Sequence, residues 1–250
     1  MTLQDRITQW IKNYADQAGM QSLVVGISGG IDSAVVSALC ARTGLNTVAV
    51  TMPIRQRPEL HDLSMRQGAW LAKNFDNVRH EIINLTTVFD EFETRMNTYN
   101  NVLGFANSRS RLRMVTLYQI AQSTQGLVVG TGNKVEDFGV GFYTKYGDGG
   151  VDISPIADCY KTEVWQMGRE LGIIEDIIDA PPTDGLWDDG RTDEDQLGGL
   201  TYKDLELAMQ QDQGEVLVKG GTELHNLQTY QAIRAKSLHK MLPIPVFKKS

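Results

Sequence analysis

The feature that most limits what this chain can fold into is a short apolar run, residues 22–28 (SLVVGIS), which passes directly into a pair of glycines. Such a run is typical of a strand covered on both faces of a parallel sheet. A second run, residues 126–132 (GLVVGTG), also ends in glycines. Because ligands bind beyond the carboxyl ends of strands in open α/β sheets, the glycine-rich segments 28–33 and 130–137 are predicted to meet at one binding edge.

The remaining apolar pattern alternates between helical and extended periodicity. In the first segment, Ile7, Trp10, Ile11 and Tyr14 recur at helical spacing. The expected elements are helices at 4–18, 31–44, 59–76 and 105–124, and further strands at 47–53 and 81–85. This alternation predicts an α/β fold, a doubly wound parallel sheet flanked by helices with Rossmann-like topology.

No repeat, low-complexity tract or linker divides the sequence, so we expect a single domain over residues 1–250. Residues 184–199 (DGLWDDGRTDEDQLGG) stand apart because they are rich in acidic residues and glycine. A solvated surface loop and a mobile lid over an active site both fit this composition.

Charge and cysteine content exclude several classes of function. With 24 basic and 31 acidic residues the net charge is −7, which disfavours a general nucleic-acid binder. Cys40 and Cys159 lie far apart without a CxxC pair, so a zinc site or disulfide scaffold is not expected. The N-terminus lacks the apolar run of a signal peptide, and no window approaches a membrane span. We expect a cytoplasmic protein that binds neither nucleic acid nor membrane.

The first glycine-rich turn carries the clearest chemistry. Its residues are Gly26, Ile27, Ser28, Gly29, Gly30, Ile31, Asp32 and Ser33. Glycines let backbone N–H groups approach an anion, and the helix N-terminus that follows favours negative charge. The carboxylate of Asp32 would repel a phosphate unless a Mg²⁺ ion lay between them. The turn therefore favours a site for a magnesium-bound phosphate.

The residues of this turn also fit two further hypotheses. The loop lacks the lysine of a Walker A motif. It matches GxSxG, the nucleophile turn of serine hydrolases, with Ser28 as nucleophile and His225 or His239 as base. A purely structural strand-to-helix turn is the third possibility.

The segment SGGIDS resembles the SGGxDS pyrophosphate loop of the ATP pyrophosphatase superfamily, whose members cleave ATP between its α- and β-phosphates. Further motifs follow in the order found in NAD synthetases: NSRSRLRM at 107–114, GTGNKVE at 130–136, TKYGDGGVD at 144–152, Pro182-Thr183 and His239-Lys240. Over about residues 4–245 the chain resembles the bacterial ammonia-dependent NAD synthetases. The resemblance implies an adenine nucleotide alpha hydrolase-like fold.

The resemblance also implies a set of site residues. ATP would contact residues 26–33, Thr131, Lys161 and Thr183, with Lys161 on the phosphates. Magnesium would be held by Asp32 and Glu136. Deamido-NAD would contact Arg111, Lys145, Asp152, His239 and Lys240. Asp148, close to the reacting nicotinate, is our candidate for taking a proton from ammonium, and we count Asp148, Lys161 and Asp32 as catalytic.

The sequence departs from the family pattern at two places. The interval from Glu136 to Thr144-Lys145 is one residue longer than usual, and counting back from Lys145 would select Asp137 as the second magnesium ligand. Pro-Thr-Asp-Gly replaces the usual Pro-Thr-Ala-Asp, which leaves the role of Asp184 open. Arg111 and Arg113 are two residues apart, so they point to different sides of a helix; Arg113 is expected to support packing or the nucleotide.

The implied reaction is the ATP-dependent amidation of deamido-NAD through an adenylate, releasing AMP and diphosphate. We expect free ammonia as the nitrogen donor, because 250 residues leave no room for a glutamine amidotransferase domain. The family also implies a homodimer. The competing hypotheses are another ATP pyrophosphatase, such as a tRNA-modifying enzyme, the serine hydrolase, and a nucleotide sensor without turnover.

Overall fold

A computed structural model of the chain describes residues 1–56, 58–183 and 192–249. Its centre is a parallel four-stranded sheet with strand order β3-β2-β1-β4. The strands are β1 (Ser22–Gly26), β2 (Asn46–Thr51), β3 (Val78–Ile82) and β4 (Gly126–Val128). This parallel sheet with helices on both faces confirms the predicted α/β fold class.

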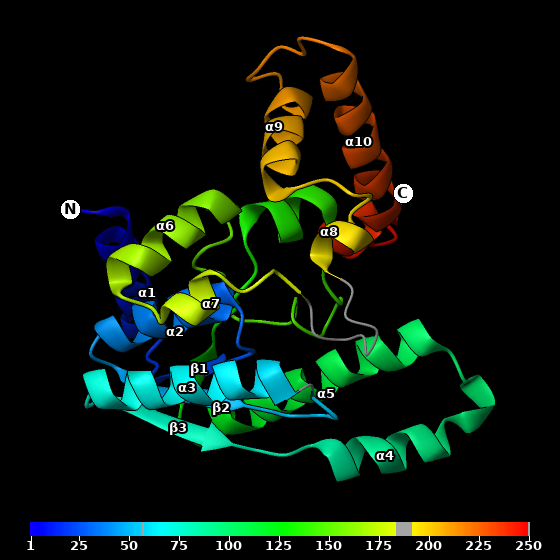
Figure 1. Cartoon of the computed structure of the whole chain (residues 1–250). Coiled ribbons are helices and arrows are strands. Elements are labelled where there is room, and N and C mark those ends of the chain that lie inside the picture. The colour runs from blue at the N-terminus through cyan, green and yellow to red at the C-terminus, as the bar shows by residue number, and fades with distance from the viewer. Residues whose placement is uncertain (57, 184–191, 250) are drawn as a thin grey trace.

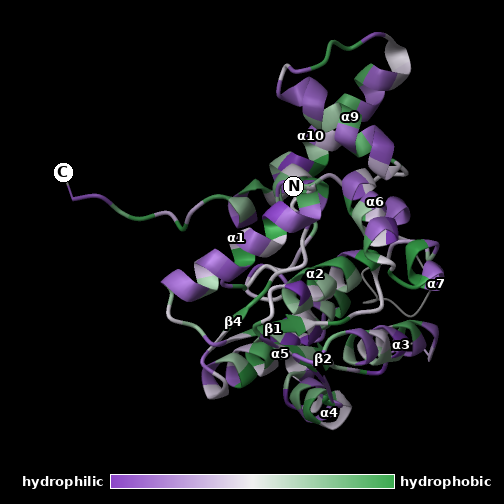
Figure 2. Cartoon of the chain, turned by 90° about the vertical axis from the view of Figure 1, so that its left-hand side faces the viewer, coloured by the Kyte–Doolittle hydropathy of each residue, from purple (hydrophilic) through white to green (hydrophobic). Residues whose placement is uncertain are grey.

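Helices cover the sheet on both sides. They are α1 (Leu3–Gln17), α2 (Ile31–Arg42), α3 (Pro58–Asn74), α4 (Thr86–Arg95) and α5 (Val102–Ser123), with a 3₁₀ turn, η1 (Asn97–Tyr99), between the last two. Buried side chains of α1, α2 and α3 form one core cluster with β1. Those of α4 and α5 form a second cluster with β1 and β2. Figure 2 shows the apolar strands between α2 and α5.

The local sequence explains the first elements. In α1 the side chain of Thr2 accepts a hydrogen bond from Asp5 N, and Asp5 accepts one in return from Thr2 N, which is a complete capping box. Ile7, Ile11 and Ala15 fall on one face at four-residue spacing and are buried. In β1 the first four residues are buried, as expected for a strand covered on both faces.

The predicted bounds of the third strand are wrong, because the strand lies at 78–82 and not at 81–85. β3 is an edge strand with a half-exposed, alternating sequence, VRHEI, and so lacks the continuous apolar run on which the prediction depended. Ile83 and Leu85 still donate backbone hydrogen bonds to Thr51 O and Pro53 O, but beyond the regular ladder.

The C-terminal half of the chain lies above α2 and the sheet (Figure 1). Its elements are the π-helix η2 (Lys134–Val140), α6 (Lys161–Leu171), α7 (Glu175–Ile178), α8 (Asp193–Gln196), α9 (Tyr202–Asp212) and α10 (Gly221–Met241). Helices α9 and α10 pack on each other and on η2 around a third core cluster that includes Val135, Leu205 and Tyr230. None of the described helices is long and apolar enough to cross a membrane.

The acidic segment 184–199 is described only in part. Residues 184–191, which include Asp184, lie outside the described residues. From Thr192 onward the chain forms the capped helix α8, where Thr192 accepts a hydrogen bond from Asp195 N at 3.3 Å. This short helix was not predicted from the sequence.

Candidate active site

A pocket of about 490 Å³ lies at the carboxyl ends of β1 and β4. β1 continues to β2 and β3 on one side, whereas β4 lies on the other side, so the strand order reverses between these two strands. That reversal opens a crevice for a ligand. Both glycine-rich segments predicted from the sequence line this pocket, 26–33 from β1 and 130–132 from β4.

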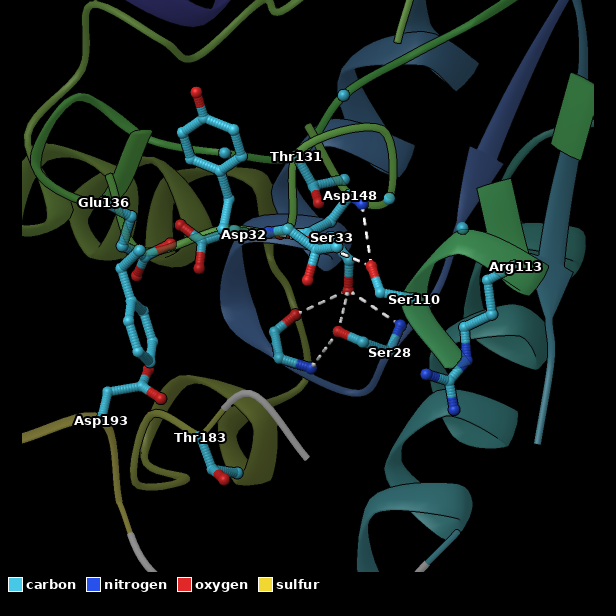
Figure 3. Close-up of a pocket in the computed structure, with 18 of the residues that line it drawn as sticks. Ser28, Asp32, Ser33, Ser110, Arg113, Thr131, Glu136, Asp148, Thr183 and Asp193 are labelled. Carbon is cyan, nitrogen blue, oxygen red and sulfur yellow. Dashed lines mark hydrogen bonds between the residues drawn. The ribbon is translucent and has the colours of Figure 1, made fainter. Parts of the chain in front are cut away.

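The loop after β1 has an anion-binding shape (Figure 3). Gly29 adopts φ +94°, and a Cβ at this position would lie 2.7 Å from Leu60 O, so only glycine fits. Gly30 is the N-cap of α2 and provides no side-chain cap. The first N–H groups of α2 thus face the pocket without a local side-chain acceptor at the cap, which leaves them available for a phosphate.

Two serines fix the shape of this loop. Ser33 Oγ donates to Gly30 O at 2.9 Å and lies 3.1 Å from Ser28 Oγ. Ser28 Oγ also accepts from Gly30 N at 3.2 Å. His225 and His239, the proposed hydrolase bases, do not line the pocket around Ser28. His61 does line it, but the hydrogen-bond partners of Ser28 Oγ among the described residues are Ser33 Oγ and Gly30 N, which argues against the serine hydrolase hypothesis.

A buried lysine joins the two carboxylates predicted to hold magnesium. Lys161 Nζ lies 2.6 Å from Asp32 Oδ2 and 2.9 Å from Glu136 Oε1. These three residues come from α2, η2 and α6. Helix α6 approaches α2 closely at Gly168, where a Cβ would lie 2.7 Å from Ile31 Cδ1. Although burial acts to lower the pKa of Lys161, the two carboxylates raise it, so the side chain stays cationic.

Asn133 connects the carboxylate of Asp32 with the backbone of Glu136. Its side chain is buried, donates from Nδ2 to Asp32 Oδ1 at 3.1 Å, and accepts from Glu136 N at 3.1 Å. It also caps η2. Asn133 belongs to the GTGNKVE motif at 130–136, but no role for it was predicted from the sequence.

The segment between Glu136 and Thr144, for which we predicted one residue more than the family pattern, begins within the π-helix η2. A π-helix takes one more residue per hydrogen-bonded turn than an α-helix. Within η2, Glu136 faces Lys161, whereas Asp137 lies against Gly132, where a Cβ would come within 2.0 Å of Asp137 Oδ2. The two candidate metal ligands therefore have separate surroundings in one pocket.

Their electrostatic surroundings also differ. Burial acts to raise the pKa of Glu136, but Lys161 and Tyr202 outweigh it, so the pKa is lowered. Burial raises the pKa of Asp137 well above its usual range, and the charges of Glu136 and Asp148 add to that rise. Glu136 is thus the carboxylate kept ionised beside Asp32.

Tyr202, at the start of α9, was not predicted from the sequence. Its hydroxyl donates to Glu136 Oε1 at 2.6 Å and lies 2.9 Å from Asp193 Oδ2. Its ring lies under the ammonium of Lys161, 4.7 Å from Nζ to the centroid. Burial, with the charges of Glu136 and Asp193, raises the pKa of Tyr202. Only the fold reveals this tyrosine, because nothing in the local sequence links it to the site.

Asp148 lines the same pocket and lies beside Ser110 (Figure 3). Its carboxylate is reached by solvent, yet protein surrounds it closely enough for burial to raise its pKa, against the effect of a hydrogen bond from Ser110. Thr131, Thr183 and Lys240 line the same pocket. Lys240 Nζ donates to Gly141 O and, at 2.9 Å, to Tyr143 O.

The other residues predicted to bind deamido-NAD do not line this pocket. Arg111 is exposed and donates from Nε to Lys145 O at 3.2 Å. Lys145 Nζ donates to His239 O at 3.3 Å. Asp152 accepts from Tyr118 Oη at 3.0 Å and from Val128 N at 2.7 Å. Arg111, Lys145 and His239 therefore form one connected group on the outer surface.

Arg113 lines the pocket. It donates to Met52 O and to Gln56 Oε1, both at 3.0 Å. Burial and the nearby Arg109 lower the pKa of Arg113 to about 10, so it remains a cation at neutral pH. The sequence had placed Arg111 and Arg113 on different sides of a helix, and the structure assigns the pocket side to Arg113.

Comparison with known proteins agrees with this geometry. A family model described as NAD synthase matches residues 3–244. An NH3-dependent NAD⁺ synthetase of Carboxydothermus hydrogenoformans is 36% identical over 244 residues, covering 94% of this chain and 93% of the relative. The structure of an NMN synthetase from Francisella tularensis matches with a TM-score of 0.88 and 28% identity, over 99% of this chain and 98% of that one.

An NH3-dependent NAD synthetase from Campylobacter jejuni has the same fold, with a TM-score of 0.77 and 24% identity over 98% of this chain and 97% of that one. The resemblance inferred from SGGIDS and the later motifs is thus confirmed over almost the whole sequence. The chain belongs to the NAD synthase family.

Proposed function

We propose that this chain is a ligase that amidates deamido-NAD to NAD with ATP and free ammonia, passing through an adenylate and releasing AMP and diphosphate. The use of ammonia is supported by the names of its relatives. The observation that carries the proposal is the position of the phosphate-binding loop 26–33 beside the buried Asp32, Lys161 and Glu136.

The donor set beside this loop fits magnesium. Asp32 and Glu136 offer hard carboxylate oxygens on either side of a cationic group. The described residues hold no cluster of three or more His, Cys, Asp or Glu ligands, and magnesium in such enzymes takes one or two carboxylates and completes its shell with phosphates and water. When bound, magnesium neutralises charge on the phosphates.

The rest of the catalytic work falls to positioning and electrostatics from the chain's own groups. In the proposed reaction the carboxylate oxygen of deamido-NAD attacks the α-phosphorus, and the α–β bond of ATP breaks. The N–H groups of α2 and the ammonium of Lys161 hold the departing diphosphate. Thr131 and Thr183 contact ATP from the opposite walls of the pocket.

Asp148 then acts in the second step. Its Oδ1 already accepts from Ser110 Oγ and Thr144 N, so we assign Oδ2 to the ammonium ion. Asp148 takes one proton from ammonium, ammonia attacks the adenylate carbonyl, and AMP leaves with the bonding electrons. The attacking nitrogen then loses a further proton to water, which gives the neutral amide. Burial raises the pKa of Asp148, which makes its carboxylate a stronger proton acceptor than an exposed one.

We also propose a homodimer that completes the deamido-NAD site. Arg111, Lys145 and His239 lie outside the pocket but contact one another on the surface. Val115 follows Arg111 by one helical turn on α5 and is 57% exposed. An apolar residue beside this group is suited to contact with a second copy.

Cys40 and Cys159 are both free thiols, which suits the reducing cytoplasm, the compartment in which we propose that the chain acts.

A second candidate substrate is nicotinate mononucleotide, the acid that corresponds to the product named in the Francisella tularensis relative. The likeness to that NMN synthetase, with its TM-score of 0.88 over 99% of this chain, favours testing it. Adenylation and amidation of the nicotinate carboxylate would proceed in the same way. The two substrates differ in one part: deamido-NAD carries an additional AMP group, which the mononucleotide lacks.

The test of this function is product identity. The purified chain is supplied with Mg-ATP and either deamido-NAD or nicotinate mononucleotide, with ammonium or glutamine as the nitrogen source. We expect NAD from deamido-NAD and ammonium, with glutamine inactive and a higher kcat/KM for deamido-NAD than for the mononucleotide. A higher kcat/KM for the mononucleotide would assign the second function. NAD formed with glutamine as efficiently as with ammonium would refute the ammonia-dependent assignment.

A further inference from the structure

The ammonium of Lys161 lies between two largely buried carboxylates. It bridges Asp32 Oδ2 and Glu136 Oε1 at 2.6 and 2.9 Å. The side chains of Lys161, Asp32 and Glu136 are only 3%, 16% and 15% exposed. In such surroundings two carboxylates without a counter-charge repel each other strongly, because little water screens them. The positive charge of Lys161 therefore offsets the negative charges of the two carboxylates.

The remaining contacts support this ion pair. Asn133 donates to the second oxygen of Asp32, and Tyr202 donates to Glu136. The ring of Tyr202 lies 4.7 Å from Lys161 Nζ and adds a cation–π contact. The pocket thus contains a preformed cation site with an ammonium group in it.

The carboxylates that hold this ammonium are those assigned to magnesium. A divalent ion coordinates carboxylate oxygens at about 2.0–2.1 Å, so it and the ammonium cannot both lie between the same two oxygens. Lys161 has a flexible four-carbon stem on the first residue of α6, and it lines the same pocket as loop 26–33. The triphosphate of ATP provides a new anionic partner within this pocket.

We propose that Lys161 is a built-in cation that keeps magnesium off the Asp32–Glu136 pair until ATP supplies phosphates to receive its ammonium. This inference rests on the proposed function, since it takes ATP as the nucleotide. It gives Lys161 two successive positions: between the carboxylates before ATP binds, and on the phosphates afterwards. Metal and nucleotide then bind cooperatively. Phosphates that bind the ammonium free the carboxylates for the metal, and a metal on the carboxylates frees the ammonium for the phosphates.

The test measures metal binding by the full chain without turnover. Mn²⁺ replaces Mg²⁺ as the probe, and free Mn²⁺ is followed by its paramagnetic resonance signal during titration. Wild type is expected to bind Mn²⁺ weakly alone and at least ~10-fold more tightly when α,β-methylene-ATP, which cannot release diphosphate, is present, after the Mn²⁺ bound by the analogue without protein is subtracted; a factor of this size is within the usual range of coupling between sites.

Lys161→Met removes the competing cation and leaves both carboxylates. We expect it to bind Mn²⁺ alone at least ~10-fold more tightly than wild type, within the same range of coupling. Lys161→Arg keeps the charge and is expected to bind metal as weakly as wild type. Lys134→Met is the matched control, because Lys134 pairs with Asp158 at 3.1 Å outside the carboxylate pair; it is expected to behave as wild type.

The outcomes separate cleanly. Tight Mn²⁺ binding by wild type without nucleotide would overturn the proposal, as would Lys161→Met binding no better than Lys134→Met. If Lys161→Met does not fold, the wild-type comparison with and without the nucleotide analogue still decides. No deamido-NAD or ammonium is present, so a failure here leaves the amidation assay unaffected, and a failure of that assay leaves this metal measurement interpretable.

Discussion

Ser110 and Asp148, which are 38 positions apart, are joined by two hydrogen bonds: Ser110 Oγ donates to Asp148 Oδ1 at 2.6 Å, and Asp148 N donates to Ser110 Oγ at 2.9 Å. A third bond, from Thr144 N at 3.0 Å, reaches the same carboxylate oxygen. Helix α5 thus fixes the turn that carries Asp148. Because Oδ1 is held in this way and Asp148 lines the pocket, Oδ2 is the oxygen that we assign to the ammonium ion.

Asp148→Asn should separate the two chemical steps. Asparagine keeps the shape and accepts the Ser110 bond, but it takes no proton from ammonium. We expect diphosphate release to continue while NAD formation falls by about 10²–10⁴-fold, the usual contribution of a general base. Rapid-quench assays of diphosphate and NAD measure both steps. Amidation at the wild-type rate would remove Asp148 from the mechanism.

Gly29→Ala tests the shape of the phosphate loop. Alanine at φ +94° is strained, and its Cβ would meet Leu60 O at 2.7 Å, so we expect a loss of about 2 kcal/mol or more in the free energy of unfolding and loss of ATP binding. Gly44→Ala is the control, since Gly44 also has positive φ (+79°) but nothing lies within 4 Å of its Cβ position. It should lose roughly 1 kcal/mol and still bind ATP.

Chemical denaturation with and without ATP measures both effects. Equal losses of stability in the two variants, with ATP binding retained in Gly29→Ala, would show that the close approach of Leu60 O is unimportant.

Asp137→Asn should stabilise the protein at neutral and alkaline pH. The pKa of Asp137 is raised by burial and by neighbouring carboxylates, so the folded state binds a proton more tightly than the unfolded state. The contribution of this group to stability is full below the unfolded pKa, near 4, and is lost as pH rises through the folded pKa. Asparagine does not titrate, so the variant does not lose this stability as the pH rises.

Melting curves at pH 4 and pH 8 measure the effect. We expect Asp137→Asn to match wild type at pH 4 and to exceed it by roughly 1 kcal/mol at pH 8. Asp76→Asn, at an exposed position, removes the same charge and should change stability by less than about 0.5 kcal/mol at both pH values. An Asp137→Asn variant that gains nothing at pH 8 would contradict the electrostatic description of η2.

Much of the fold was accessible from the sequence because its signals are local. The apolar run of β1, the glycines after it and the helical spacing of α1 each lie within a few neighbouring residues, and all gave elements close to those observed. β3 was misplaced because an edge strand is not uniformly apolar. Helices α9 and α10 were not predicted, because their buried positions become apparent only when they pack on η2.

The site was predictable only as far as its motifs extend. Loop 26–33 could be interpreted from glycines and Asp32 alone. The contact between Lys161 and Asp32 spans 129 positions, and Tyr202 reaches Glu136 across 66, so only the fold brings these residues together. The π-helix η2 (Lys134–Val140) was not predicted from the sequence.

Val115→Glu tests the proposed dimer. A charge at this 57% exposed position of α5 would be buried against the partner, so we expect the variant to become a monomer and to lose most of its affinity for deamido-NAD. Leu217→Glu, at an 84% exposed position between α9 and α10, is the control and should stay dimeric. Size-exclusion chromatography with light scattering gives the mass; a wild-type mass of 27.8 kDa would refute the dimer.

The central claim, a ligase that adenylates a nicotinate carboxylate and then amidates it, is tested most directly by diphosphate release. The purified chain is mixed with Mg-ATP, with and without deamido-NAD, and ammonium is added last. The mechanism predicts that diphosphate appears only with deamido-NAD, and that NAD appears only after ammonium is added. Diphosphate released from ATP without deamido-NAD, or no release under any of these conditions, would contradict it.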